Sequence, residues 1–87
     1  MTQYRRGANY ERKIKKEYEE DGYLVLRSAG SKGPFDLVAI KEDSTILIQC
    51  KLRKPTKKEI EGVLETVRKY NIHGQAHLRW PEGGLYY

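Results

Sequence analysis

A carboxylate, an amide and an ammonium group, those of Asp36, Gln49 and Lys51, occur in a stretch of the chain that is otherwise rich in apolar residues. Carboxylate and amide oxygens are ligands that a hard divalent cation such as Mg²⁺ prefers, with water completing the shell. Asp36 could join such a cation to a phosphate, while the side chain of Gln49 and the backbone carbonyl of Cys50 could add further oxygens. Lys51 could position an attacking water or stabilise the negative charge that develops on the phosphate. These residue types therefore indicate metal-assisted hydrolysis of a phosphate ester.

The elements that must position these groups are the two strands of a β-hairpin. Apolar, β-branched runs precede and follow the polar segment Lys41–Ser44, which is typical of a hairpin turn. If Ile40 lies opposite Thr45, counting back along both strands places Asp36 opposite Gln49. Side chains alternate across a strand, so the lysine two residues further along lies on the same face. The predicted hairpin thus gathers the three polar groups on one face.

A helix precedes the hairpin. Tyr10, Ile14 and Tyr18 recur at every fourth position, which predicts an amphipathic helix over residues 7–21. Gly22 supplies the stop signal. The apolar stripe of this helix should pack on the predicted sheet.

Glu11 lies at or beside that stripe and has two interpretations. As a carboxylate in the first turn it would interact favourably with the helix dipole and need no other role. Turned toward the hairpin, it would supply the second carboxylate that the metal site otherwise lacks. Spacing alone favours the first interpretation.

The rest of the chain predicts one more helix and three more strands. A Thr-x-x-Glu capping box over residues 56–59 opens the second helix, which runs to about Tyr70. The remaining predicted strands are bounded by turn residues and cover 23–28, 75–80 and 85–87. The order of helix, three strands, helix and two strands predicts an α/β sandwich with the helices packed on the sheet.

Residues 29–33, with the sequence Ala-Gly-Ser-Lys-Gly, form a predicted small, flexible loop before Asp36. Ser31 and Lys32 are then either turn residues or contacts to a substrate phosphate. A Walker A nucleotide-binding loop is excluded, because the Gly-Lys-Ser/Thr ending is missing.

Composition predicts a single small domain with an anionic partner. Eighty-seven residues support only a small core, so oligomerisation is expected. The formal charge of +5 and the isoelectric point near 9.4 favour nucleic acid as the partner. Residues 1–6 are expected to form a flexible basic arm, and basic clusters flank the candidate site at Arg5, Arg6, Arg12, Lys32, Arg53, Lys54, Lys57 and Lys58.

The cysteine and histidine content argues against other kinds of site. The single cysteine, Cys50, falls on the strand face opposite Gln49 and Lys51, which predicts a buried structural thiol and excludes a disulfide framework. His73 and His77 lack zinc-like spacing to other ligands and are expected at the surface. No apolar run approaches a membrane span, so a cytoplasmic protein is expected.

Three segments, in this order, resemble a known family: Gly7-Ala-Asn-Tyr-Glu11, Arg27-Ser-Ala-Gly-Ser31-Lys-Gly-Pro-Phe-Asp36 and Ile48-Gln-Cys-Lys51. They are similar to the PD-(D/E)xK nuclease superfamily and, within it, to the archaeal Holliday junction resolvases, including those of archaeal viruses. The resemblance covers about residues 7–70. It implies one nuclease-like domain over residues 1–87 with a restriction-endonuclease-like core, a mixed and mainly antiparallel five-stranded sheet flanked by two helices.

The resemblance also implies roles for single residues. Glu11 and Asp36 would be ligands of Mg²⁺, with Mn²⁺ as a substitute, and Lys51 would be catalytic. Ser31 would be an active-site loop residue near the scissile phosphate, and Arg27 matches a basic position before that loop. Family members are homodimers that nick paired strands of a four-way DNA junction symmetrically.

Gln49 departs from the family pattern, because a glutamate is usual at its position. The leading hypothesis is a Mg²⁺-dependent, structure-selective DNA endonuclease for four-way or related branched junctions, with a role in DNA recombination and repair. One alternative is a catalytically weak or inactive DNA-binding module on the same fold, and another is a nuclease acting on other DNA substrates. Lys51 favours an enzyme, because a protein that only binds DNA has no need of an ammonium group on the strand face of Asp36.

Overall fold

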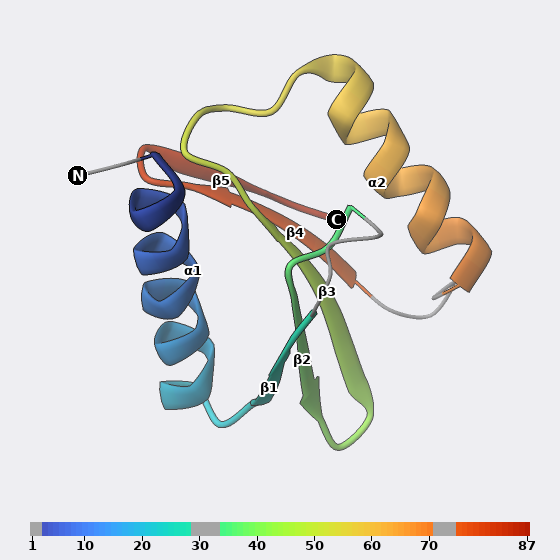
Figure 1. Ribbon diagram of the computed structural model, residues 1–87. Coiled ribbons are helices and arrows are strands. Elements are labelled where there is room, and N and C mark those ends of the chain that lie inside the picture. Colours follow the sequence, from blue (N-terminus) through green and yellow to red (C-terminus); the bar gives the residue numbers. More distant parts are fainter. Residues whose placement is uncertain (1–2, 29–33, 71–74) are drawn as a thin grey trace.

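The computed structural model describes residues 3–28, 34–70 and 75–87, which form two helices and a five-stranded sheet. The helices lie on opposite faces of the sheet (Figure 1). In chain order the elements are α1 (Gln3–Glu20), β1 (Leu24–Arg27), β2 (Leu37–Lys41), β3 (Ser44–Cys50), α2 (Lys57–Tyr70), β4 (Gln75–Trp80) and β5 (Gly83–Tyr86). The predicted order of elements and the predicted fold class are confirmed.

The strands lie side by side in the order in which they occur in the chain. Strands β3 and β4 are parallel, since α2 returns the chain between them, and the other three neighbouring pairs are antiparallel. In the β2–β3 hairpin Ile40 pairs with Thr45, which confirms the predicted register. The ladder extends as far as the pair of Leu37 and Ile48.

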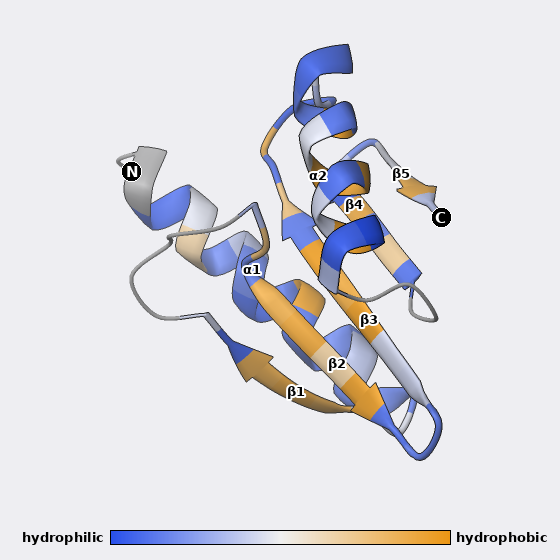
Figure 2. Cartoon of the chain, turned by 90° about the vertical axis from the view of Figure 1, so that its right-hand side faces the viewer, coloured by the Kyte–Doolittle hydropathy of each residue, from blue (hydrophilic) through white to orange (hydrophobic). Residues whose placement is uncertain are grey.

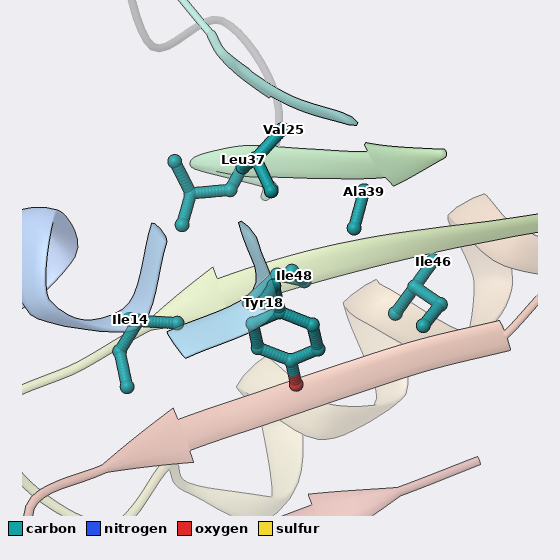
Figure 3. Packing of buried hydrophobic residues seen from close by; sticks show 7 residues of the cluster. All are labelled: Ile14, Tyr18, Val25, Leu37, Ala39, Ile46 and Ile48. Atoms are coloured by element: carbon teal, nitrogen blue, oxygen red, sulfur yellow. The ribbon is translucent and has the colours of Figure 1, made fainter. Parts of the chain in front are cut away.

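Two apolar clusters, one on each face, hold the helices to the sheet. The cluster under α1 is the larger and consists of Ile14, Tyr18, Val25, Leu37, Ala39, Ile46 and Ile48 (Figure 3). The cluster under α2 has Val63, Ala76 and Leu78 at its centre. Because side chains alternate along a strand, Ile46 and Ile48 of β3 face α1, whereas Gln49 lies beside Leu78 on the α2 face.

Helix α1 begins earlier than predicted. It starts at Gln3, so the prediction of a flexible arm is wrong for residues 3–6. Arg5 and Arg6 are good helix formers, and an interior glycine such as Gly7 costs only about 1 kcal/mol relative to alanine. The packed turns that follow therefore suffice to extend the helix through the glycine.

The predicted apolar stripe and stop signal of α1 are confirmed. Ile14 and Tyr18 are buried, and Tyr10 packs beside them. The helix ends at Glu20, and Gly22 then adopts a φ of 94°, a left-handed conformation that glycine reaches without strain. This turn directs the chain back along α1 into the sheet.

The capping box of α2 is present as predicted. The Glu59 amide donates to Thr56 Oγ1 over 3.2 Å, and the Thr56 amide donates to Glu59 Oε1 over 2.8 Å. Val63 is buried against the sheet, with Ile60 and Val67 packed around it. The cap and the apolar stripe together fix where α2 begins relative to the end of β3.

The prediction that His77 lies at the surface is wrong. Its side chain is half-buried, and Nδ1 lies 2.6 Å from the hydroxyl oxygen of Tyr18 on α1. The register of β4 with β3 places His77 beside Ile48, on the face that α1 covers. Sequence spacing alone does not reveal that neighbour.

Some predictions fall outside the described residues. These are the loop 29–33, with Ser31 and Lys32, and the segment 71–74, with His73. In the parts that are described, neither helix is both long enough and apolar enough to cross a membrane.

Candidate active site

The candidate site lies where β2 begins, opposite the last residues of β3. The Asp36 amide donates to the carbonyl of Ile48 over 2.9 Å, and the Cys50 amide donates to Asp36 Oδ2 over 2.8 Å. The carboxylate thus takes the acceptor position that the next carbonyl of β2 would have filled. The ladder therefore ends one pair earlier than predicted, and Asp36 meets the backbone of β3 rather than pairing with Gln49.

Glu11 approaches this point from α1. Its Oε1 lies 3.7 Å from Nε of Arg27, at the end of β1. Burial raises the pKa of Glu11, the negative charge of Asp36 raises it further, and the Arg27 charge lowers it. The charge of Asp36 thus reaches Glu11. Because α1 begins at Gln3, Glu11 lies outside its first turn, so the helix-dipole interpretation is wrong and the fold favours the one that turns Glu11 toward the hairpin.

Burial also raises the pKa of Asp36, although the hydrogen bond from the Cys50 amide and the charges of Lys51 and Arg27 oppose that rise. Two repelling carboxylates that are partly withdrawn from water are stabilised by a shared cation. Among the described residues no three aspartate, glutamate, histidine or cysteine side chains form a metal-binding group. A cation at Glu11 and Asp36 would thus need neutral oxygens, water or substrate to complete its shell.

Gln49 offers one such neutral oxygen. Its side chain is only 7% exposed, and its buried Oε1 has no hydrogen-bond partner among the described residues. An unsatisfied buried acceptor costs about 1–3 kcal/mol, which coordination to a cation would offset. Because Glu11 comes from the α1 face and Gln49 from the α2 face, a shared cation has to lie at the end of the sheet, beyond Leu37. The donor set fits a hard, oxygen-preferring ion such as Mg²⁺ or Mn²⁺.

Cys50 contributes its backbone to the site. Its amide binds Asp36, and its side chain packs against the α1 cluster on the face opposite Gln49, as predicted. Burial, assisted by the nearby charges of Asp36 and Glu11, raises the pKa of the thiol well above its ordinary value. The thiol is therefore a poor nucleophile.

Lys51 is held by helix α2. Its Nζ lies 2.9 Å from Oε2 of Glu59, and Arg53 binds both oxygens of the same carboxylate at 3.0 and 3.3 Å. The hydrogen bonds from Arg53, the Thr56 amide and Lys51 hold the pKa of Glu59 well below its usual range. Sequence reasoning identified Glu59 as a capping residue and missed this contact with the candidate catalytic lysine.

The predicted nucleic-acid contacts are solvent-exposed wherever the structure describes them. They lie on α1, at the end of β1, on the segment after β3 and in the first turn of α2: Arg5, Arg6, Arg12, Arg27, Arg53, Lys54, Lys57 and Lys58. These exposed positive charges lie on elements that precede and follow the candidate site in the chain, and the phosphate backbone of DNA would be a suitable partner for them.

Comparison with solved structures defines the class. The structure of Hjc from Archaeoglobus fulgidus, a Holliday junction resolvase from an archaeal hyperthermophile, matches 94% of this chain with a TM-score of 0.66 and 24% sequence identity. The match covers 71% of that protein. At this identity the likeness shows the fold alone, which this chain shares with that protein.

The family follows from the sequence itself. The model of the archaeal Holliday junction resolvase (Hjc) family matches residues 2–82, and the chain belongs to this family. The crossover junction endodeoxyribonuclease Hjc of Methanocaldococcus jannaschii is 43% identical over 54 residues, which is 62% of this chain. The aligned part spans 40% of the length of that relative.

Proposed function

We propose that this protein is a metal-dependent endodeoxyribonuclease that cleaves phosphodiester bonds at four-way or related branched DNA junctions. The observation that carries the proposal is the convergence of two carboxylates where β2 begins. The Cys50 amide holds Asp36, and Glu11 of α1 lies 3.7 Å from Arg27, where the charge of Asp36 helps to raise its pKa. Lys51 is close enough for its charge to lower the pKa of Asp36. Membership of the resolvase family supports branched DNA as the substrate.

In this proposal the residues of the site fall into two groups, those that hold a metal ion and the lysine that acts on the phosphate. Glu11, Asp36, the side-chain oxygen of Gln49 and the backbone carbonyl of Cys50 hold Mg²⁺, for which Mn²⁺ can substitute. When bound, the ion polarises the scissile phosphate and lowers the pKa of an attacking water. Lys51 stabilises the negative charge that develops on the phosphate oxygens.

The basic side chains outside the site supply affinity rather than chemistry. The exposed arginines and lysines of α1 and of the start of α2 bind phosphates of the junction arms and position the strand. Ser31 is proposed to lie near the scissile phosphate and Lys32 to contact a substrate phosphate, while Arg27, at the end of β1, is proposed to bind the DNA before that loop. A homodimer would carry the two sites that paired nicks require.

A second candidate function follows from the neutral side chain of Gln49. A site with two carboxylates attracts a divalent cation less strongly than a site with three. The chain would then be a DNA-binding module on the nuclease fold with weak or no catalysis.

Cleavage assays on labelled four-way junction, flap and plain duplex DNA, each with and without Mg²⁺, test the proposal. We expect Mg²⁺-dependent cleavage of the junction in preference to the duplex. Binding without cleavage on every substrate, with Mg²⁺ or Mn²⁺ present, would support the binding module instead. Preferred cleavage of the duplex would identify a nuclease with a different substrate.

A further inference from the structure

Glu59 joins the first turn of α2 to the end of β3. Its Oε2 lies 2.9 Å from Nζ of Lys51, and among the described residues it is the carboxylate with which Lys51 forms an ion pair. The two side chains are 32% and 25% exposed, so the pair lies at the surface and is only partly shielded from solvent. A single pair at the surface restrains a side chain only weakly, so the restraint on Lys51 depends on how firmly Glu59 itself is held.

The carboxylate of Glu59 is itself held rigidly. Oε1 accepts hydrogen bonds from the Thr56 amide at 2.8 Å and from Arg53 Nη1 at 3.0 Å, and Oε2 accepts from Arg53 Nη2 at 3.3 Å. The backbone of α2 fixes the first contact, and the planar guanidinium fixes the other two. Lys51, on a flexible four-carbon chain, is thus held by an acceptor that does not move freely.

Lys51 has a competing attraction to Asp36. Its charge lowers the pKa of Asp36, so the two groups interact, yet the ion pair of Lys51 is with Glu59. A direct pair between Lys51 and Asp36 would occupy the carboxylate proposed to hold the cation. The position of Glu59 keeps the ammonium beside the site without blocking Asp36.

We propose that Glu59 is a positioning residue that orients the ammonium group of Lys51 for catalysis. The inference rests on the proposed function for its catalytic consequence. Capping alone does not account for the contact, because a glutamine would accept the Thr56 amide equally well and needs no lysine partner. The negative charge is what Lys51 requires.

Three variants separate positioning from capping. Glu59→Gln keeps an oxygen for the Thr56 amide but removes the charge, whereas Thr56→Ala removes the cap hydroxyl and keeps the Glu59 carboxylate. Glu61→Gln makes the same charge change at an exposed position of α2. We expect Glu59→Gln to lower kcat for junction cleavage by roughly 10- to 100-fold, since misplacing a catalytic group can cost about that much, with KM unchanged. Thr56→Ala and Glu61→Gln should retain kcat.

If Thr56→Ala lowers kcat as much as Glu59→Gln does, or if Glu59→Gln changes only KM, the positioning role is wrong.

A second readout does not depend on cleavage. The side-chain ammonium of Lys51, assigned by its loss in Lys51→Met, should give a slowly exchanging ¹H–¹⁵N NMR signal in the wild type and in Thr56→Ala but not in Glu59→Gln.

The two readouts separate this inference from the proposed function. If the wild type does not cleave any DNA but the ammonium signal depends on Glu59, the proposed function fails and the restraint of Lys51 stands. If the wild type cleaves junctions and the signal is the same in Glu59→Gln, the proposed function stands and the positioning role is overturned.

Discussion

Asp36 serves the fold and the proposed chemistry at the same time. Its Oδ2 accepts the Cys50 amide, so the end of the hairpin fixes one oxygen of the carboxylate. None of the described residues donates a hydrogen bond to the second oxygen, Oδ1, so this oxygen is open to a ligand. A carboxylate anchored in this way needs little reorganisation when it binds a cation.

At residue scale, the site should respond to charge at position 49. Gln49→Glu is nearly isosteric and adds a carboxylate, so it should lower the Mg²⁺ or Mn²⁺ concentration that gives half-maximal cleavage. Metal-free affinity for the junction should stay the same or weaken slightly, because the new charge repels phosphate. Gln75→Glu, the same change at an exposed position of β4, is the matched control and should leave the metal response unaltered.

Two results would count against this account of Gln49. An unchanged metal response in Gln49→Glu would mean that this side chain does not contact the cation. An inactive wild type that gains cleavage through Gln49→Glu would favour the binding-module hypothesis.

The sequence predicted much of the candidate site, because carboxylates, amides and lysines on an apolar hairpin are conspicuous. The hydrogen bond between Asp36 and Cys50 could not be predicted, since it depends on β2 beginning only at Leu37 while β3 extends to Cys50. Glu59 was recognised only as a capping residue, because its contact with Lys51 depends on how α2 packs against β4. Residue spacing along the chain predicts a single helix or strand, but it does not predict the contacts between two of them.

At element scale, a polar contact joins α1 to β4. Tyr18 Oη lies 2.6 Å from His77 Nδ1, and Arg79 Nη2 binds Glu17 at 2.9 Å nearby. Burial, together with the positive charge of Arg79, lowers the pKa of His77. The contact therefore favours neutral His77.

This lowered pKa predicts how stability depends on pH. As the pH falls from about 7 to about 5, the unfolded chain binds a proton at His77 before the folded chain does, so the free energy of unfolding falls. Urea unfolding across this range should show a larger loss of unfolding free energy in the wild type than in His77→Gln. Parallel stability curves would show that His77 is not perturbed in the folded state.

The elements were predicted with unequal success, for physical reasons. The α2 helix combines a capping box with a strict apolar stripe, so sequence defined its start well. The sequence pattern predicts the start of α1 too late, because glycine is a poor helix former, whereas the arginines before Gly7 favour helix. Strand β5 begins at Gly83, within the predicted turn, because pairing with Trp80 outweighs the low strand propensity of glycine.

At the scale of the whole molecule, neither described helix covers the face of β1 and β2 that points away from α1. Leu24 and Leu26 of the edge strand β1 are 62% and 50% exposed and pair with Ile40 and Val38 of β2. These four residues face away from α1, and α2 lies over the β3–β4 side of the sheet (Figure 2). An edge strand with an apolar face is a common site of association.

The chain is expected to form a homodimer, and this surface and the aromatic end (Trp80, Leu85, Tyr86 and Tyr87) are the two predicted contact regions. Sedimentation should show a dimer at micromolar concentration. We expect the double change of Leu24→Lys and Leu26→Lys to weaken it more than Tyr86→Ser with Tyr87→Ser. Trp80 and Leu85 are already partly buried within the monomer, so dimerisation through the aromatic end would bury less additional apolar surface. A monomer with and without junction DNA would reject the dimer.

The most direct measurement compares junction cleavage and junction binding by the wild type and Asp36→Asn in the same Mg²⁺ buffer. Asparagine keeps an oxygen for the Cys50 amide and so preserves the end of the hairpin, but it removes the charge proposed to hold the cation. We predict that cleavage is lost while the affinity for the four-way junction is retained, since phosphate contacts elsewhere supply it. Cleavage by Asp36→Asn at the rate of the wild type would contradict the site proposed for this protein.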